Sequence, residues 1–265
     1  MEALQPLDLE VCAGQVLGVL GPNGSGKTTL LRVLAGLQRP TAGAVTLLGK
    51  APTDRALTRR VAYQSEGPLP LDTLSAPEYL AFVGAEIGID NRDCDRRAAA
   101  LLTRIGLQHA GRRRIRTFST GMAKRLALAA ALLGEPEVLL LDEPTSGLDP
   151  FGSATVMEVL RERAEAGAAV LMASHHLLEV EESCDEVLVL HNGRVHQRGS
   201  LEQLLAKDEH ALVVRGLDDD ALAALGEQAT ARGASDVRVE RPRDHLFALF
   251  RNCLLYTSPS PRDRG

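Results

Sequence analysis

One short stretch constrains this chain more than any other feature of its sequence. Residues 21–29 read Gly-Pro-Asn-Gly-Ser-Gly-Lys-Thr-Thr and match the phosphate-binding pattern G-x-x-x-x-G-K-[ST]. The glycines let the backbone turn tightly and direct successive N–H groups at phosphate oxygens. An apolar segment, 16–20, predicts a strand that enters the loop, and 29–35 predicts a helix that leaves it with its positive dipole end facing the anion.

This frame of strand, loop and helix favours nucleotide binding over a glycine-rich turn that matches by chance. In such a loop Lys27 supplies a point charge for the β- and γ-phosphates, and Thr28 supplies a hydroxyl for Mg²⁺. The remaining candidate binding residues of the loop are Gly21, Pro22, Asn23, Gly24, Ser25, Gly26 and Thr29.

Two adjacent carboxylates follow a second apolar run. Residues 138–141 predict a strand buried on both faces of a parallel sheet, and Asp142 and Glu143 come directly after it. Asp142 is therefore a candidate ligand of Mg²⁺, and Glu143 is a candidate general base for an attacking water. The alternative is a loop with two solvated acids. It is less favoured, because the apolar strand that precedes them directs both carboxylates to a defined place.

A third candidate site precedes an alanine- and leucine-rich helix at residues 126–133. Ser119 and Gly121 lie before this helix, where free N–H groups can bind an anion. Taken alone, this pattern is better explained by an ordinary helix cap.

The order of these motifs on one chain is informative. The loop at 21–29, the segments 118–122, 140–144 and 146–149, and the pair Ser174-His175 follow one another along the sequence. This arrangement resembles the ATP-binding subunit of an ABC transporter from about residue 4 to residue 205. The resemblance implies an α/β fold: a P-loop NTPase (RecA-like) core with an antiparallel β subdomain and a helical subdomain at about 66–135. It also implies ATP and Mg²⁺ as cofactors.

The resemblance implies a role for each further motif. Gln64 senses Mg²⁺ and the attacking water, and His175 contacts the γ-phosphate, while His176 begins the next helix and is expected to be structural or solvated. Asp142 and Glu143 keep their roles as metal ligand and catalytic base. The signature segment binds the γ-phosphate of ATP held by the opposite subunit, and the 146–149 loop crosses the dimer interface; their candidate residues are Ser119, Thr120, Gly121, Met122 and Asp149.

The signature reads Ser-Thr-Gly-Met where the family normally has Ser-Gly-Gly-Gln, and this variant resembles the ABC-2 type exporter ATPases. We therefore expect a homodimer, joined head to tail through ATP, that powers export through a separate membrane permease. The surface after Gln64 would receive that permease. Its apolar residues either contact the permease or pack the core of the helical subdomain, and both interpretations stay open for Leu69, Leu71, Leu74 and Tyr79.

Composition limits the other function classes. The 265-residue chain carries a net charge of −5 and has no apolar run near the ~20 residues that cross a bilayer. Nor does it open with a signal-peptide pattern. We expect a cytoplasmic protein, peripheral on the inner face of the cell membrane through its permease, with no nucleic-acid partner. The four cysteines lack paired spacing and predict unpaired thiols.

The two ends depart from the family pattern. Residues 1–20 contain no aromatic residue to stack on adenine, so the opening strand and its aromatic residue are expected to lie before Met1. Residues 206–252 predict a small α+β accessory domain. Residues 253–265 resemble the translation of an adapter used in sequencing libraries, and they are expected not to belong to the native protein.

Two other functions fit the sequence less well. A soluble ABC ATPase acting on ribosomes or DNA usually carries two cassettes or a long coiled-coil insertion, and this chain shows one phosphate-binding loop and no such insertion. A non-catalytic regulatory module should lack the glutamate or the histidine, and Glu143 and His175 are both present.

Overall fold

The structure is a computed structural model that describes residues 3–200, 203–204, 224 and 227–228. Residues 3–197 belong to one compact unit. The predicted accessory domain at 206–252 lies outside the described residues, apart from residues 224, 227 and 228, and so does the segment 253–265.

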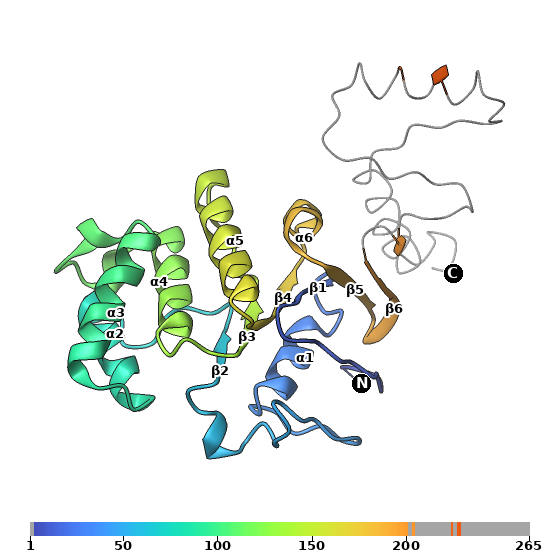
Figure 1. The fold of residues 1–265 in the computed structure, drawn as a ribbon, viewed down its shortest axis with the longest axis horizontal. Coiled ribbons are helices and arrows are strands. Elements are labelled where there is room, and N and C mark those ends of the chain that lie inside the picture. Colours follow the sequence, from blue (N-terminus) through green and yellow to red (C-terminus); the bar gives the residue numbers. More distant parts are fainter. Residues whose placement is uncertain (1–2, 201–202, 205–223, 225–226, 229–265) are drawn as a thin grey trace, which may run out of the picture. The chain divides into compact units, whose positions relative to one another are not determined.

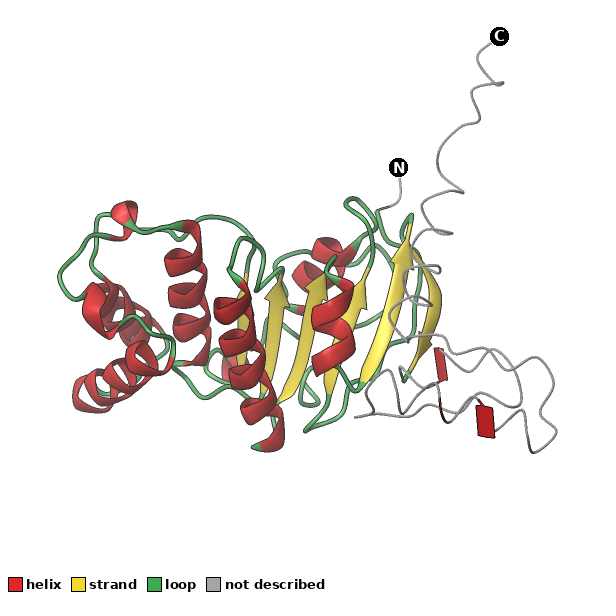
Figure 2. Ribbon diagram, turned by 90° about the horizontal axis from the view of Figure 1, so that it is seen from above, coloured by secondary structure: helices red, strands yellow, loops and turns green. Residues whose placement is uncertain are grey.

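A six-stranded sheet forms the centre of this unit (Figure 1, Figure 2). Its order is β2-β3-β4-β1-β5-β6, and the neighbours from β2 to β5 pair in parallel. Parallel strands need crossover connections, so both faces become covered and the strands read as continuous apolar runs. The strands are β1 (Val16–Leu20), β2 (Val61–Gln64), β3 (Val138–Asp142), β4 (Ala169–Ser174), β5 (Glu186–His191) and β6 (Arg194–Gly199).

Helices cover both faces of the sheet (Figure 1). Helix α1 (Lys27–Leu34) packs on one face, where Leu30 and Leu31 join the sheet residues Leu17 and Leu140 in one buried cluster. Helices α5 (Pro150–Glu165) and α6 (Leu177–Ser183) cover the other face. There Gly18 of β1 permits a close approach, because a Cβ atom at this position would lie 2.8 Å from Val180 Cγ1 and 2.8 Å from Cys184 Sγ.

A group of helices extends beyond β2, within residues 66–135. It consists of α2 (Ala76–Glu86), α3 (Asn91–Arg104) and α4 (Thr120–Leu132), with short 3₁₀ helices at Gln108–Ala110 and Ile115–Thr117. Ser75 begins α2 with a capping box, in which its N–H donates to Glu78 Oε2 at 2.7 Å. The buried cluster of this group includes Tyr79, Leu80, Ile105, Leu126 and Leu133.

The structure decides some of the open interpretations of single residues. Tyr79 is buried in the helical core, Leu69 and Leu74 pack against that core in part, and Leu71 stays exposed. Among the described cysteines, Cys12, Cys94 and Cys184 are unpaired, as predicted.

The remaining regions are the segment between α1 and β2 and the link between β5 and β6. The antiparallel β subdomain is represented between α1 and β2 by an isolated bridge, Leu47 to Lys50, and by the 3₁₀ helix Arg55–Leu57. A two-residue turn, Asn192 and Gly193, with φ of 48° and 74°, links β5 to β6. None of the helices in the described part of the chain is both long and apolar enough to cross a membrane.

Leu139, in the middle of β3, is 0% exposed. Replacing it with Ala should lower the free energy of unfolding by about 2–5 kcal/mol, because the surrounding core cannot fully close the cavity. Urea unfolding measures this difference. The matched control is Leu37→Ala, since Leu37 is 66% exposed, and its change should stay within about 0.5 kcal/mol. Equal losses in the two variants would contradict the described core.

Candidate active site

The candidate residues meet because four parallel strands end at one edge of the sheet. Leu20 of β1 lies opposite Ser174 of β4, and Asp142 of β3 lies opposite Ala173. On the far side of β3, Gln64 of β2 pairs with Leu141. The segments that follow these strand ends are therefore neighbours, and they carry the predicted phosphate-binding loop, the two carboxylates and the histidine.

The phosphate-binding loop folds back on itself at the start of α1. Lys27 Nζ donates to the carbonyl oxygens of Gly21 at 2.7 Å and Pro22 at 3.4 Å. Gly26 precedes the helix in a left-handed conformation, with φ of 106°. The first N–H groups of α1 have no partner within the helix, so they can face an anion. Only glycine fits at position 21, because a Cβ atom there would lie 2.3 Å from the Leu190 carbonyl oxygen.

Glu143 joins this loop to the histidine. Its Oε1 atom lies 3.5 Å from Lys27 Nζ, and its Oε2 atom lies 2.8 Å from His175 Nδ1. Glu143 is 4% exposed, whereas the His175 side chain is 40% exposed. Three residues predicted from separate motifs thus form one chain of contacts that runs from a buried ammonium to an imidazole at the surface.

The backbone of Glu143 is held at both ends in an unusual conformation. Its φ is 51°, in the left-handed region that non-glycine residues rarely adopt. Its N–H donates to the Ala173 carbonyl at 2.9 Å, and its carbonyl accepts from Lys124 Nζ at 3.0 Å. These two bonds fix the direction in which the carboxylate leaves the chain.

Lys124 is a site residue that the sequence reasoning missed. It is 9% exposed, and burial lowers the pKa of its ammonium, while the nearby carboxylates of Glu66, Asp142 and Glu143 oppose that shift. Lysine is almost never buried without a partner. Its position among the apolar residues of α4 was the available signal.

Asp142 and Gln64 are buried beside this chain of contacts, 1% and 3% exposed. Burial raises the pKa of Asp142, while a hydrogen bond from Thr28 acts in the opposite direction. Asp142 Oδ1 and both polar atoms of the Gln64 side chain have no hydrogen-bond partner. Since unpartnered buried polar atoms are costly, and oxygen atoms are the ligands that Mg²⁺ prefers, Thr28, Gln64 and Asp142 fit a magnesium site.

The signature residues lie in a separate group. Ser119 caps α4 by accepting from the Met122 N–H at 3.2 Å, and Asp149 caps α5 by accepting from the Gly152 N–H at 2.7 Å. A Cβ atom on Gly121 would lie 3.2 Å from Leu148, so the two segments are neighbours. Ser119, Thr120 and Asp149 are exposed.

This group does not complete the site within the same chain. In the part of the chain that the structure describes, no hydrogen bond or ion pair joins Ser119, Thr120 or Asp149 to Lys27, Glu143 or His175. The structure agrees with the interpretation of Ser119 as a helix cap, because its Oγ accepts from the Met122 N–H.

A polar cluster behind His175 was also missed. Glu179 Oε2 accepts a hydrogen bond from Ser174 Oγ at 3.2 Å and another from Thr145 Oγ1. Ser174 Oγ in turn accepts from the His176 N–H at 2.9 Å. The exposed His176 ring lies beside that of His175, with ring centroids 4.0 Å apart, as expected for a residue outside the centre of the site.

Known proteins share both the sequence and this fold. Residues 4–146 match the protein family described as ABC transporter. An uncharacterised ABC transporter ATP-binding protein of Synechocystis sp. is 40% identical over 225 residues, which are 84% of this chain and 64% of that protein. The daunorubicin resistance ATP-binding protein DrrA3 of Streptomyces coeruleorubidus is 40% identical over 208 residues, or 78% and 66%. The chain thus spans about two thirds of either relative.

A solved structure of the ATP-binding subunit of an ABC transporter has a TM-score of 0.73 and 28% identity, over 94% of this chain and 93% of that one. The phosphate-binding loop, the parallel sheet and the buried carboxylates at its edge agree with these matches. The chain belongs to the ABC transporter family, as an ATP-binding domain with the P-loop NTPase fold.

Proposed function

We propose that this chain binds and hydrolyses MgATP and powers export through a separate membrane permease. The observation that carries the proposal is the buried Glu143 carboxylate, 3.5 Å from Lys27 and 2.8 Å from His175, next to an unpartnered oxygen of Asp142. A base, a phosphate-binding cation and a candidate metal ligand meet there, and phosphoryl transfer to water needs all three.

The residues divide the work as follows. Lys27 and the N–H groups of residues 21–29 hold the phosphates, so that the γ-phosphorus faces a water beside Glu143. The water oxygen bonds to that phosphorus as the bond to the leaving ADP oxygen breaks, and Glu143 takes the proton. His175, held by Glu143 Oε2, contacts the γ-phosphate from the rim of the site. Positioning and charge stabilisation supply most of the acceleration.

Mg²⁺ would be held by Thr28, Gln64 and Asp142. When bound, the ion neutralises charge on the β- and γ-phosphate oxygens. The unpartnered buried oxygens of Asp142 and Gln64 support this assignment, because an ion would satisfy atoms that the folded chain leaves without partners.

The functional unit in this proposal is a homodimer arranged head to tail. Ser119, Thr120, Gly121 and Met122 of one copy would contact the γ-phosphate held by Lys27 of the other, and Asp149 would lie at the interface. The exposure of Ser119, Thr120 and Asp149 supports this arrangement. A closed two-fold dimer completes two equal sites at once.

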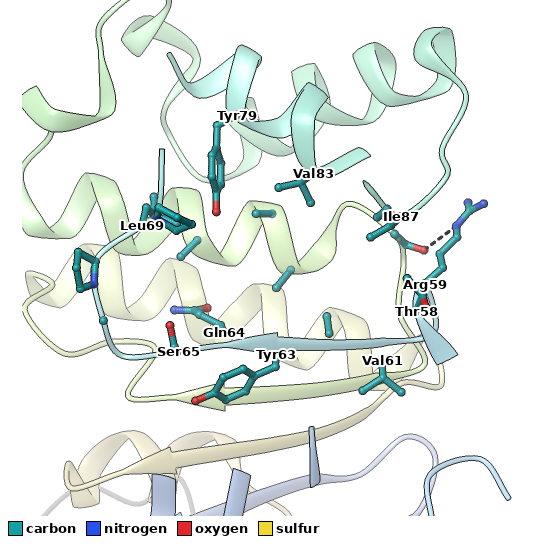
Figure 3. A pocket seen from close by; sticks show the side chains of 18 residues that line it. Thr58, Arg59, Val61, Tyr63, Gln64, Ser65, Leu69, Tyr79, Val83 and Ile87 are labelled. Atoms are coloured by element: carbon teal, nitrogen blue, oxygen red, sulfur yellow. Dashed lines mark hydrogen bonds between the residues drawn. The ribbon is translucent and has the colours of Figure 1, made fainter. Parts of the chain in front are cut away.

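The partner would dock beside Gln64. A pocket of about 390 Å³ lies between β2 and the helical group, with Leu69, Val83 and Ile87 among its lining residues (Figure 3). Gln64 also lines it, so a partner in this pocket would touch a residue assigned to Mg²⁺. The likeness to the daunorubicin resistance protein DrrA3 supports export as the direction. The chain would then act in the cytoplasm, on the inner face of the membrane.

Asp142→Asn should change how stability depends on pH. Because burial raises the pKa of Asp142, the folded state holds this proton more tightly than the unfolded state does. The nucleotide-free wild type therefore loses stability as pH rises from about 4, the ordinary value, through the raised pKa. The amide of the variant cannot ionise, so Asp142→Asn should lack this loss.

Urea unfolding of the two proteins between about pH 4 and pH 7 measures the difference. Asp8→Asn, a change to a carboxylate outside the site, is the control and should follow the wild type. At neutral pH, MgATP should raise the melting temperature of the wild type by more than that of Asp142→Asn. Identical pH profiles for wild type and Asp142→Asn would contradict the burial argument.

Glu143→Gln should lower kcat for ATP hydrolysis by about 10²–10⁴-fold, the usual contribution of a general base. ATP binding should persist, since the amide keeps the shape of the side chain. Steady-state phosphate release and equilibrium nucleotide binding measure the two effects. The control, Glu165→Gln, alters an exposed side chain at the end of α5 and should leave both unchanged. Wild-type turnover by Glu143→Gln would refute the base assignment.

A mixing experiment tests the head-to-tail dimer. Lys27→Ala and Ser119→Arg should each be inactive alone, because the first removes the phosphate-binding cation and the second blocks the opposing surface. A mixed dimer contains one site with both groups intact, so the mixture should hydrolyse ATP. Mixing two Lys27→Ala preparations is the control. Lack of any recovered activity would argue against a site shared between copies.

A further inference from the structure

We propose that Glu179 is a positioning residue: one oxygen of its carboxylate ties the segment that carries Glu143 to the segment that carries His175. This inference rests on the proposed hydrolysis and deepens it, by identifying what holds the base and the histidine together. Glu179 itself touches neither residue in the contacts described for the site.

The contacts that carry the inference converge on a single atom. Glu179 Oε2 accepts from Ser174 Oγ at 3.2 Å and also from Thr145 Oγ1. Ser174 is 0% exposed and Thr145 is 2% exposed. The two hydroxyls come from different segments, one at the end of β4 and the other just beyond β3, and the carboxylate on α6 is their shared acceptor.

The Ser174 hydroxyl holds the backbone on both sides of His175. Ser174 directly precedes the histidine, and its Oγ also accepts from the N–H of His176, which directly follows, at 2.9 Å. Because the hydroxyl proton is directed to Glu179, the lone pairs of Oγ are left for that N–H. Through Ser174, the Glu179 carboxylate thereby fixes the backbone turn that carries His175.

The Thr145 contact holds the segment that connects Glu143 to the loop beyond it. Thr145 lies two residues after Glu143, and its carbonyl accepts from the Leu148 N–H at 3.0 Å. The same turn leads to Asp149, which caps α5. A shift of Thr145 would therefore move the base at one end and the proposed dimer contact at the other.

Chemistry favours an acid at this position. An ionised carboxylate only accepts, so it can receive both hydroxyl protons, and such charge-assisted bonds are stronger than neutral ones. Without it, two buried hydroxyls would lose their shared acceptor, which is costly. An amide keeps one accepting oxygen without the charge, so Glu179→Gln should restore part of the activity that Glu179→Ala loses.

The first test separates positioning from nucleotide binding. Glu179→Ala should lower kcat for ATP hydrolysis at least 10-fold and leave KM for ATP within twofold, because the phosphate-binding loop keeps its own contacts. Glu179→Gln should fall between Ala and wild type. The exposed control Glu165→Ala should match the wild type. A kcat within twofold of wild type for Glu179→Ala, or a parallel rise in KM, would overturn the inference.

A double-mutant cycle tests the shared atom. Thr145→Val removes one hydroxyl with little change in shape, and Glu179→Ala removes its acceptor. If the two act through one contact, Thr145→Val/Glu179→Ala should lose no more activity than Glu179→Ala alone. Losses that multiply would mean separate roles and would overturn the inference.

A measurement without turnover separates this inference from the proposed function. In nucleotide-free protein, hydrogen exchange should speed up in Glu179→Ala at residues 143–149 and 174–176 together, while residues 21–29 keep their wild-type rate. Should the wild type fail to hydrolyse ATP, the proposed function falls, but this experiment still tests the tie. Unchanged exchange in both segments, or faster exchange throughout the chain, would refute it.

Discussion

The parallel pairing of β2, β3, β4 and β1 is the constraint on which the rest of the structure depends. The phosphate-binding loop, Gln64, the two carboxylates and the histidine each lie at or just beyond the end of one of these strands, and parallel register brings those ends to a common edge. Residues separated by more than a hundred positions, such as Lys27 and Glu143, therefore come within 3.5 Å of each other.

The edge also concentrates groups that the folded chain supports poorly. Asp142 and Gln64 bury polar atoms without partners, Lys124 is buried against a carbonyl, and Glu143 has a left-handed backbone. Each of these features opposes folding. In the proposed function Mg²⁺ would satisfy the buried oxygens of Asp142 and Gln64, so part of the cost of folding and the readiness to bind a ligand arise from the same atoms.

The sequence predicted what depends on local pattern. Apolar runs predicted β1 and β3, and the motifs at 21–29 and 142–143 predicted residues that lie together in the structure, because strand ends in a parallel sheet have fixed neighbours. Lys124 and Glu179 were missed, since their importance arises only when α4 and α6 pack against the sheet. For Leu69 and Tyr79 the sequence left two interpretations open, because apolar residues next to a pocket can also belong to the core.

Gly18 has a consequence beyond packing. Because it lacks a side chain, α6 lies directly on β1, with Val180 and Cys184 where a Cβ atom would clash. Glu179 is the neighbour of Val180, so the gap left by one missing methyl sets how far the carboxylate on α6 can reach toward Ser174 and Thr145. Gly18 thus acts as a spacer: a larger residue there would push α6 away from β1 and would move the Glu179 carboxylate away from the two hydroxyls.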